Sequence, residues 1–401
     1  MKLKKKVKKT KSPPKQVKAT ARPVGNSMNP TQRIIDALKE RYMFRFNKGN
    51  KHMEFCHFTE SEYHDLSDTD FNSMKVELNL MNIACSREAL RGIIFSNVWP
   101  EYDPYVEIIG GLKQWDGHDH IADLAATVTT DEPGYFRWCL KKWMVGFVGS
   151  LVDENTVNQL ALILCGAQGI GKSTWFGSIL LPGLRKYYSS GFMDPKDKET
   201  QVQLSELCLF NMDEVENLKP KNVEGIKELI TKGSIYLRRA YTTLSQNYIR
   251  RCSFCGTANG TNILHDVTGN RRFLCHNVLS IDYELKGICL EQVYAQALHE
   301  YRAGFRYWLN TEEQAAVEQM NARFRAMNLE EELVTAYLEP CQDGEPGARR
   351  MQAHEIQSLL QSKADCGKLS HIAIGKILSA KGFTSKKSNG ISKWIVREKQ
   401  V

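Results

Sequence analysis

The chain has 401 residues, of which 42% are hydrophobic and 25% are charged, and its net charge is +8. This length predicts two or three domains with real cores, and no apolar stretch approaches the ~20 residues that a bilayer span needs. The eleven cysteines are odd in number and lie scattered in apolar runs, which argues against a disulfide framework and favours a reducing cytoplasm. No apolar segment follows the N-terminal lysines, so we expect no signal peptide.

The positive charge lies at the two ends of the chain. Residues 1–22 hold ten Lys and Arg and no acid, and residues 345–401 hold eleven Lys and Arg against four acids. Because the whole chain carries +8, the segment between these ends carries −9. Basic ends favour a polyanionic partner such as nucleic acid. The alternative for residues 1–29 is a solvated, disordered basic tail with no partner.

Residues 30–125 predict a mainly helical N-terminal domain, because apolar residues recur at helical spacing over 30–42 and 86–99. A stronger amphipathic helix begins at Asp131-Glu-Pro-Gly134. Its apolar stripe comprises Leu140, Trp143, Met144, Phe147, Val148 and Leu151. We expect this stripe to pack against the sheet of the next domain, at 126–310.

The N-terminal region closes with the turn Trp115-Asp-Gly117, directly followed by His118 and His120 on either side of Asp119. A polar helix start is the interpretation that we favour here. Metal binding by the two histidines is the alternative.

Residues 160–174 read as a buried strand that leads into a complete phosphate-binding loop. Gly166, Gly171, Lys172 and Ser173 fit the pattern G-x-x-x-x-G-K-[ST]. In such a loop the backbone N–H groups surround a phosphate, the lysine reaches the β- and γ-phosphates, and the serine ligates Mg²⁺. We therefore predict ATP and Mg²⁺ as cofactors; a glycine-rich turn in another α/β fold is the alternative. The predicted nucleotide-binding residues are Gly166, Ala167, Gln168, Gly169, Ile170, Gly171, Lys172, Ser173 and Thr174.

A second apolar strand, at 207–212, ends in Asp213-Glu214. ATP hydrolysis needs one acid that holds the Mg²⁺ shell and another group that orients the attacking water. We assign Asp213, together with Ser173, to the metal and Glu214 to the water. An acid pair that caps a helix is the alternative.

Two later segments supply further catalytic candidates. A strand-like arm ends at Asn259, whose amide would contact the γ-phosphate or its water unless it serves only as a turn residue. Further along, Arg271 and Arg272 follow a Gly-Asn turn and suit an arginine finger, which acts on the nucleotide of a neighbouring subunit. The finger predicts a ring of subunits; a surface ion pair to Asp266 is the alternative.

The C-terminal part is predicted as a helical linker, 311–349, followed by a compact basic domain, 350–401. Two predicted helices precede a hairpin whose tight turn is Asn389-Gly390. This order is typical of a winged helix, with the basic wing residues Lys386, Lys387 and Lys393. We expect these lysines to contact DNA; a basic module that contacts protein is the alternative.

This order of motifs resembles the virulence-associated E family of phage and mobile-element proteins, which is similar to the superfamily 3 helicases. The match covers roughly residues 35–310. The residues that carry it are Leu112–Ile121, Gly166–Ser173, Asp213-Glu214, Lys227 with Arg238–Tyr241, Gly256–Asn259 and Asp266–Phe273. The resemblance implies an α/β fold with an AAA+-like P-loop ATPase core, assembled as a hexamer-like ring that draws single-stranded DNA through its centre. It implies an ATP-dependent DNA helicase or translocase that acts in the replication of a phage or mobile element.

In superfamily 3 rings a hairpin before the sensor strand touches the DNA, which here places Arg238, Arg239, Gln246 and Asn247 near the channel. The chain departs from the pattern at the hairpin tip, which lacks the Lys or His that many such rings carry. No primase signature stands upstream, so a primase partner would be a separate chain. The alternative function is an ATP-switched DNA-binding replication initiator or regulator that does not unwind DNA.

Overall fold

The computed structural model describes residues 29–218, 220–238, 244–264, 269–325, 329–364, 369–388 and 391–399. The chain forms two compact units, which meet in sequence at Pro100 and Glu101; residues 47–52 belong to the second unit. Within the described ranges, no helix combines the length and the hydropathy that a membrane span requires.

The first unit combines helices with an antiparallel sheet. The helices are α1 (Pro30–Lys39), α2 (Asp68–Leu80) and α3 (Arg87–Ile94), and the strands are β1 (Tyr42–Asn47), β2 (Met53–His57) and β3 (His64–Asp65), in the order β3-β2-β1. Tyr42 and Phe44 of β1 are buried in one cluster with Phe55 and Leu90. The prediction of a mainly helical domain is therefore only half right. Aromatic residues occupy every second position in Tyr42-Met-Phe-Arg-Phe46, and period-two spacing is typical of a strand.

The boundary between the units lies near residue 100 rather than at 125. Strand β4 (Glu101–Tyr102) and the helices α4 (Pro104–Gly110) and α5 (His120–Ala126) belong to the second unit. Tyr105 of α4 and Leu124 of α5 are fully buried in the same apolar cluster as Trp143. Helices α4 and α5 therefore contribute to the hydrophobic core of the predicted ATPase domain.

A six-stranded sheet organises the second unit, in the order β5-β12-β6-β11-β8-β7. Its strands are β5 (Val128–Thr130), β6 (Ala161–Cys165), β7 (Tyr188–Gly191), β8 (Leu209–Met212), β11 (Ser253–Ala258) and β12 (Phe273–Ile281). The strands run parallel except β5, which pairs antiparallel with β12. Leu162 and Leu164 of β6 pack in one apolar cluster, whereas Ile163 and Cys165 pack in another. The sheet is therefore buried on both faces, as parallel sheets are.

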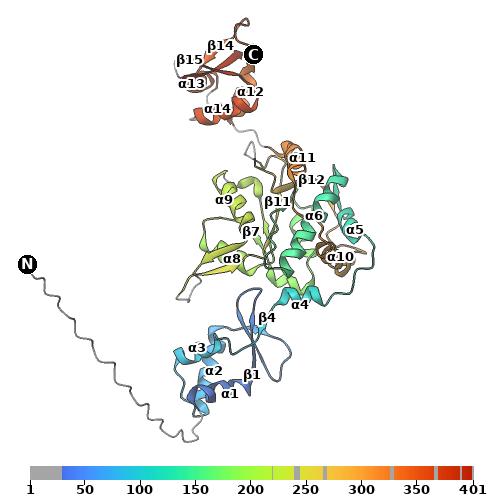
Figure 1. Cartoon of the computed structure of the whole chain (residues 1–401), viewed down its shortest axis with the longest axis vertical. Coiled ribbons are helices and arrows are strands. Elements are labelled where there is room, and N and C mark those ends of the chain that lie inside the picture. Colours follow the sequence, from blue (N-terminus) through green and yellow to red (C-terminus); the bar gives the residue numbers. More distant parts are fainter. Residues whose placement is uncertain are drawn as a thin grey trace, which may run out of the picture. The chain divides into compact units, whose positions relative to one another are not determined.

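Helices cover both faces of this sheet (Figure 1). On one face lie α6 (Pro133–Val152), α7 (Lys172–Ser178) and α10 (Leu290–Arg302), and on the other lie α8 (Lys198–Glu206) and α9 (Pro220–Thr231). The predicted apolar stripe of α6 is confirmed, because all six of its residues are buried in the cluster on the first face. Trp143 also donates its indole N–H to the carbonyl oxygen of Phe254, over 2.9 Å, which joins α6 to β11.

The predicted hairpin is a separate antiparallel pair of β9 (Ser234–Leu237) and β10 (Gln246–Ile249). Strand β10 ends at Ile249 and β11 begins at Ser253, so the second arm of the hairpin does not continue through to Asn259; Arg250 lies between the two strands. This arginine is buried, and it donates hydrogen bonds to the carbonyl oxygens of Lys232, over 2.7 Å, and Ile230, over 2.8 Å. Those bonds fix the base of the hairpin.

The C-terminal part begins with α11 (Thr311–Asn321) and α12 (Leu329–Tyr337). The two expected helices, α13 (Ala353–Lys363) and α14 (His371–Ala380), precede an antiparallel pair of β15 (Ser385–Ser388) and β16 (Ile391–Glu398). Two further strands also pair with β16: β13 (Leu338–Pro340), which lies in the expected linker, and β14 (Arg349–Met351), which crosses the expected boundary with the basic domain. Asn389 and Gly390 lie outside the described residues.

Candidate active site

The glycine-rich loop joins the carboxyl end of β6 to the start of α7. Gly169 and Gly171 have φ values of +82° and +92°, in the left-handed region that glycine adopts without strain. A Cβ atom on Gly171 would lie 2.3 Å from the ring of Tyr283, so no other residue fits there without movement. The predicted residues Gly166–Thr174 therefore form one tight loop and the first turn of α7.

Lys172 points back into this loop. Its side-chain ammonium donates hydrogen bonds to the carbonyl oxygens of Gly166, over 2.9 Å, and Ala167, over 2.7 Å. The residue is only 6% exposed, and burial lowers its pKa, while Cys165 and Glu216 act in the opposite direction. A positive charge thus sits inside the curve of the loop, where the sequence predicts a phosphate.

Asp213 follows β8 and gathers three donors at one carboxylate oxygen. Its Oδ1 accepts hydrogen bonds from Asn211 Nδ2 over 2.7 Å, from Ser173 Oγ over 3.2 Å and from Thr257 Oγ1 over 3.2 Å. Strand β11 lies between β6 and β8, so the carboxyl ends of the three strands meet at one edge. The structure therefore brings Ser173 and Asp213 together, and their oxygen donors fit the ligand preference of Mg²⁺.

The two glutamates after Asp213 lie differently. Glu214 has a φ of +53° and is exposed, and its carboxylate accepts a hydrogen bond from Asn217 Nδ2 over 2.9 Å. The 3-10 turn Val215–Asn217 instead brings Glu216 to the end of β11, where its Oε1 accepts the backbone N–H of Asn259 over 2.9 Å. Its Oε2 is buried and has no hydrogen-bond partner among the described residues.

Sequence reasoning missed Glu216 and Thr257. The signal for Glu216 was a second acid, two residues beyond Glu214, in the run Asp-Glu-Val-Glu. Asn259 stands directly after β11, as predicted, and its side chain is exposed.

Arg271 and Arg272 directly precede β12. Arg271 is exposed, and its backbone N–H donates to Glu318 Oε1 over 3.2 Å. Neither guanidinium forms an ion pair within the part of the chain that the structure describes. Burial, followed by the charge of Arg271, lowers the pKa of Arg272. Asp266, the alternative ion-pair partner, lies outside the described residues.

The predicted nucleic-acid residues of the hairpin are accessible where they are described. Arg238, Gln246 and Asn247 are exposed, and Arg239 lies outside the described residues. Tyr236, which sequence reasoning missed, pairs with Asn247 across the two strands and is 70% exposed. The hairpin therefore carries an exposed aromatic ring, Tyr236, and an exposed arginine, Arg238.

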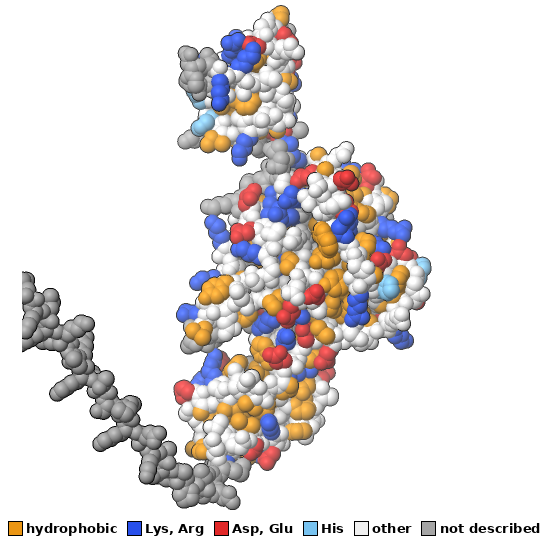
Figure 2. All heavy atoms as spheres, in the orientation of Figure 1, with side chains coloured by type: hydrophobic (Ala, Val, Ile, Leu, Met, Phe, Trp, Pro, Cys, Tyr) orange, Lys and Arg blue, Asp and Glu red, His pale blue; other side chains and the backbone are white. Residues whose placement is uncertain are grey.

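The predicted wing lysines are not equivalent. Lys386 lies opposite Lys393 in the β15–β16 pair, and its ammonium contacts Asp343 Oδ2 over 2.7 Å. Hydrogen bonds from Arg350 and Lys386 hold the pKa of Asp343 well below its ordinary value. Lys387 is exposed and forms no ion pair among the described residues. On the face drawn in Figure 2, basic and acidic side chains are interspersed over the described surface.

Residues 109–326 match the virulence-associated protein E-like domain. No protein of curated function matches the sequence. Solved structures of the C-terminal region of NrS-1 are similar at low identity. The apo structure of its residues 305–718 shares 12% identity at a TM-score of 0.48, covering 93% of this chain and 100% of that chain. An A form apo structure of the same region shares 12% identity at a TM-score of 0.46, covering 92% of this chain and 99% of that chain.

The domain match spans more than half of the chain and includes the glycine-rich loop, Asp213 and both arginines before β12. The resemblance to the virulence-associated E family is thereby confirmed, and this chain belongs to the virulence-associated protein E-like family.

Proposed function

We propose that this protein is an ATPase that couples hydrolysis to movement along DNA, as a helicase or translocase in the replication of a phage or mobile element. One observation carries the proposal: the buried ammonium of Lys172 and the Ser173–Asp213 pair lie in the same loop region, at the carboxyl end of a buried parallel sheet. Ligands of open α/β sheets bind at that edge.

Binding of a nucleotide would use the backbone of the loop and would redirect the side chain of Lys172. The backbone N–H groups at the start of α7 suit a phosphate, since helix N-termini carry partial positive charge. Lys172 would exchange the carbonyl oxygens of Gly166 and Ala167 for phosphate oxygens. Ser173 and Asp213 would hold Mg²⁺, which, when bound, neutralises charge on the phosphates during transfer.

A carboxylate must then polarise the attacking water. Glu214 is the residue that the sequence suggests, because it directly follows Asp213. Glu216 is the candidate that the contacts favour, since its buried Oε2 has no partner among the described residues while its Oε1 is tied to Asn259. In this scheme Asn259 senses the γ-phosphate or its water.

The active site would be completed by a second copy of the chain. The guanidinium groups of Arg271 and Arg272 have no ion-pair partner among the described residues, so they are available for the phosphate of a neighbour. An arginine supplied in this way stabilises charge in the transition state. We therefore propose a hexamer-like ring, which the mass of the protein in solution with ATP and single-stranded DNA would test.

The hairpin would hold single-stranded DNA. Arg238, Arg239, Gln246 and Asn247 would contact the backbone, and Tyr236 would stack on a base. Lys387 and Lys393 of the C-terminal module would add salt-sensitive affinity, while Lys386 would first have to leave Asp343. A primase that acts with this protein would be a separate chain, and the many thiols favour the cytoplasm.

The test is the variant Lys172→Ala, with Lys198→Ala as a matched control, because Lys198 is an exposed lysine on α8. We expect Lys172→Ala to lose the ATPase activity that single-stranded DNA stimulates, while it folds and still binds DNA. Lys198→Ala should behave as the wild type. Wild-type turnover by Lys172→Ala would overturn the proposal.

The C-terminal module favours one second candidate. Two helices followed by a basic antiparallel pair suit a winged helix that binds duplex DNA, so ATP would switch the assembly of an initiator or regulator without unwinding. A strand-displacement assay separates the two functions. An initiator would bind DNA and show no displacement that depends on ATP.

A further inference from the structure

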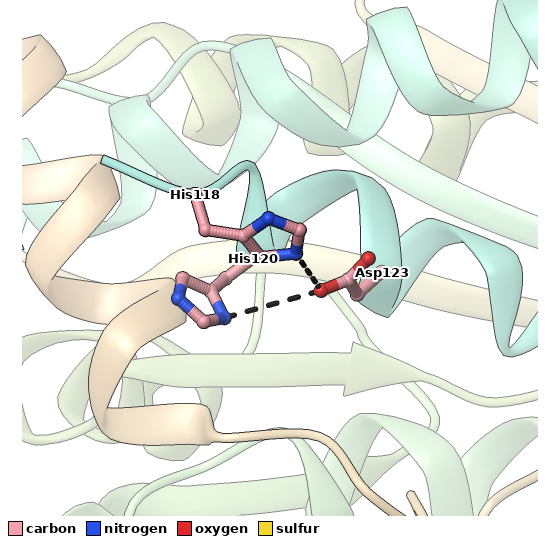
Figure 3. A group of neighbouring side chains, drawn as sticks. All are labelled: His118, His120 and Asp123. Atoms are coloured by element: carbon pink, nitrogen blue, oxygen red, sulfur yellow. Dashed lines mark hydrogen bonds and ion pairs between the residues drawn. The ribbon is translucent and has the colours of Figure 1, made fainter. Parts of the chain in front are cut away.

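Three side chains with metal-binding atoms converge where α5 begins, outside the nucleotide site. His118 Nε2 lies 2.6 Å from Asp123 Oδ2, and His120 Nδ1 lies 4.0 Å from the same oxygen. One ligand atom from each of the three residues lies within 4.8 Å of the other two. Figure 3 shows both rings directed at the Asp123 carboxylate. Sequence reasoning saw the two histidines but not the aspartate that joins them.

A fourth residue orients this group. The other ring nitrogen of His120, Nε2, lies 3.0 Å and 3.1 Å from the two carboxylate oxygens of Asp116. A carboxylate behind a histidine fixes its tautomer, so that Nε2 carries the proton and Nδ1 keeps its lone pair for a metal. Histidines that ligate a metal in proteins almost always donate the other ring N–H in this way, to a carboxylate, a backbone carbonyl or water.

The turn that carries these residues is held at several points. Asp116 accepts the backbone N–H of His118 over 2.9 Å, and its own backbone N–H donates to Gln292 of α10 over 3.1 Å. Gly117 supplies the left-handed conformation of the turn, with a φ of +95°. Asp119 caps α5 and accepts a hydrogen bond from Arg137 over 2.6 Å. The ligand atoms therefore come from a braced turn and need only small rotations.

The local charge favours a cation. Asp116, Asp119 and Asp123 lie within eight residues around the start of α5, and Arg137 pairs with Asp119. The partial positive charge at the start of α5 opposes a cation, but two remaining carboxylates exceed that half charge. His120 is 13% exposed and Asp123 is 46% exposed, so the group has a buried side and a side open to water.

We propose that His118 Nε2, His120 Nδ1 and Asp123 Oδ2 bind a transition-metal dication, for which Zn²⁺ is the best fit, with water as the fourth ligand. Two imidazoles and a carboxylate suit zinc in tetrahedral geometry. Metal–ligand bonds of about 2.1 Å place tetrahedral ligand atoms about 3.4 Å apart. The 2.6 Å contact would lengthen and the 4.0 Å contact would shorten, each by less than ~1 Å, which side-chain rotation supplies. This site is independent of the proposed ATPase.

The test uses the full chain without an affinity tag of histidines. Titration with Co²⁺, a spectroscopic substitute for zinc, should produce the visible absorption of a four-coordinate site, and Zn²⁺ should displace the cobalt. His118→Ala and Asp123→Asn should lose this signal. His64→Ala, which removes an exposed histidine of β3, should retain it. Asp116→Asn should weaken metal affinity about 10- to 100-fold, because it loosens His120 without removing a ligand.

A second measurement reports on the turn itself and does not depend on colour. Zn²⁺ should slow amide hydrogen exchange over 116–123 in the wild type and leave it unchanged in His118→Ala. The proposal is overturned if the wild type takes up neither cobalt nor zinc. It is equally overturned if His118→Ala and Asp123→Asn, folded by circular dichroism, bind either metal as well as the wild type does.

Discussion

The backbone N–H of Asn259 donates to Glu216 Oε1 over 2.9 Å, so the end of β11 is tied to the turn that follows β8. This bond uses only one carboxylate oxygen. The other oxygen, Oε2, is buried and has no hydrogen-bond partner among the described residues. It is therefore a desolvated acceptor at the edge of the sheet where the sequence predicts the catalytic residues.

Replacing Glu216 by glutamine should reduce ATP turnover about 10²- to 10⁴-fold, the range of a general base, with nucleotide affinity kept. Glutamine preserves the acceptor for the Asn259 N–H and removes the charge. The matched variant is Glu214→Gln, which removes the neighbouring exposed charge, and we expect it to lose less. Single-turnover rates of both variants decide the assignment. A loss confined to Glu214→Gln would return the role to that residue.

Asp213→Asn should abolish turnover that depends on Mg²⁺, because the amide offers the metal a weaker, neutral ligand. Thr257→Val is the control: it also removes a hydrogen bond to Asp213 Oδ1 but no predicted metal ligand. The Mg²⁺ concentration for half-maximal ATPase activity should therefore rise steeply in Asp213→Asn and little in Thr257→Val. An unchanged requirement in both variants would exclude Asp213 from the metal shell.

His276 should make the fold sensitive to acid. Its ring is buried between those of Tyr135 and Phe136, at centroid distances of 5.1 Å and 4.9 Å, and its Nε2 has no hydrogen-bond partner in the described structure. Burial, together with the charge of Arg323, lowers its pKa to about 3. The folded state thus holds the neutral ring, whereas the unfolded chain takes up a proton near pH 6.5.

The contribution of His276 to the free energy of unfolding should therefore be fully present above about pH 6.5. Below that pH the free energy of unfolding should fall by about 1.4 kcal/mol per pH unit, until the pH reaches the pKa of His276 in the folded state. Urea unfolding at pH 7, 6 and 5 measures this slope, and His276→Gln should reduce it by that amount. Equal slopes for the two proteins would show that the buried ring does not titrate as described.

Two hairpin variants should weaken binding of single-stranded DNA in different ways. Arg238→Ala should reduce the salt dependence of affinity by about one counterion, because it removes a phosphate contact. Tyr236→Ala should lower affinity by about 1–3 kcal/mol per stacked base and leave the salt slope unchanged. Fluorescence anisotropy over a salt series separates the two effects. If affinity depends on salt equally in Arg238→Ala and in the wild type, Arg238 does not contact a DNA phosphate.

The sequence correctly predicted those parts of the fold that depend on residues close together in the chain. The apolar stripe of α6 and the loop at Gly166–Thr174 lie where the sequence placed them, since helical periodicity and the glycine spacing act over a few residues. The meeting of Ser173 with Asp213 was also predicted, because strands that run parallel end at a common edge.

Contacts between segments that lie far apart in the sequence could not be predicted from such local patterns. Strand β13 lies in the expected helical linker and β14 crosses its end at residue 349, and neither was predicted because each forms by pairing with the distant β16. The position of Glu216 depends on the three-residue turn Val215–Asn217, which the spacing of residues in the sequence does not predict. The contact between His118 and Asp123 depends on the geometry of α5, which the sequence pattern did not specify.

Strand β5 has a practical consequence for anyone who shortens this chain. Val128–Thr130 is the only described segment that shields the outer edge of β12, and it precedes the glycine-rich loop by more than thirty residues. An expression fragment that starts at Pro133 would bare that edge, and uncovered edges invite intermolecular pairing. Truncations meant for crystallisation or assay should therefore begin before Glu101, where α4 and α5 are also retained.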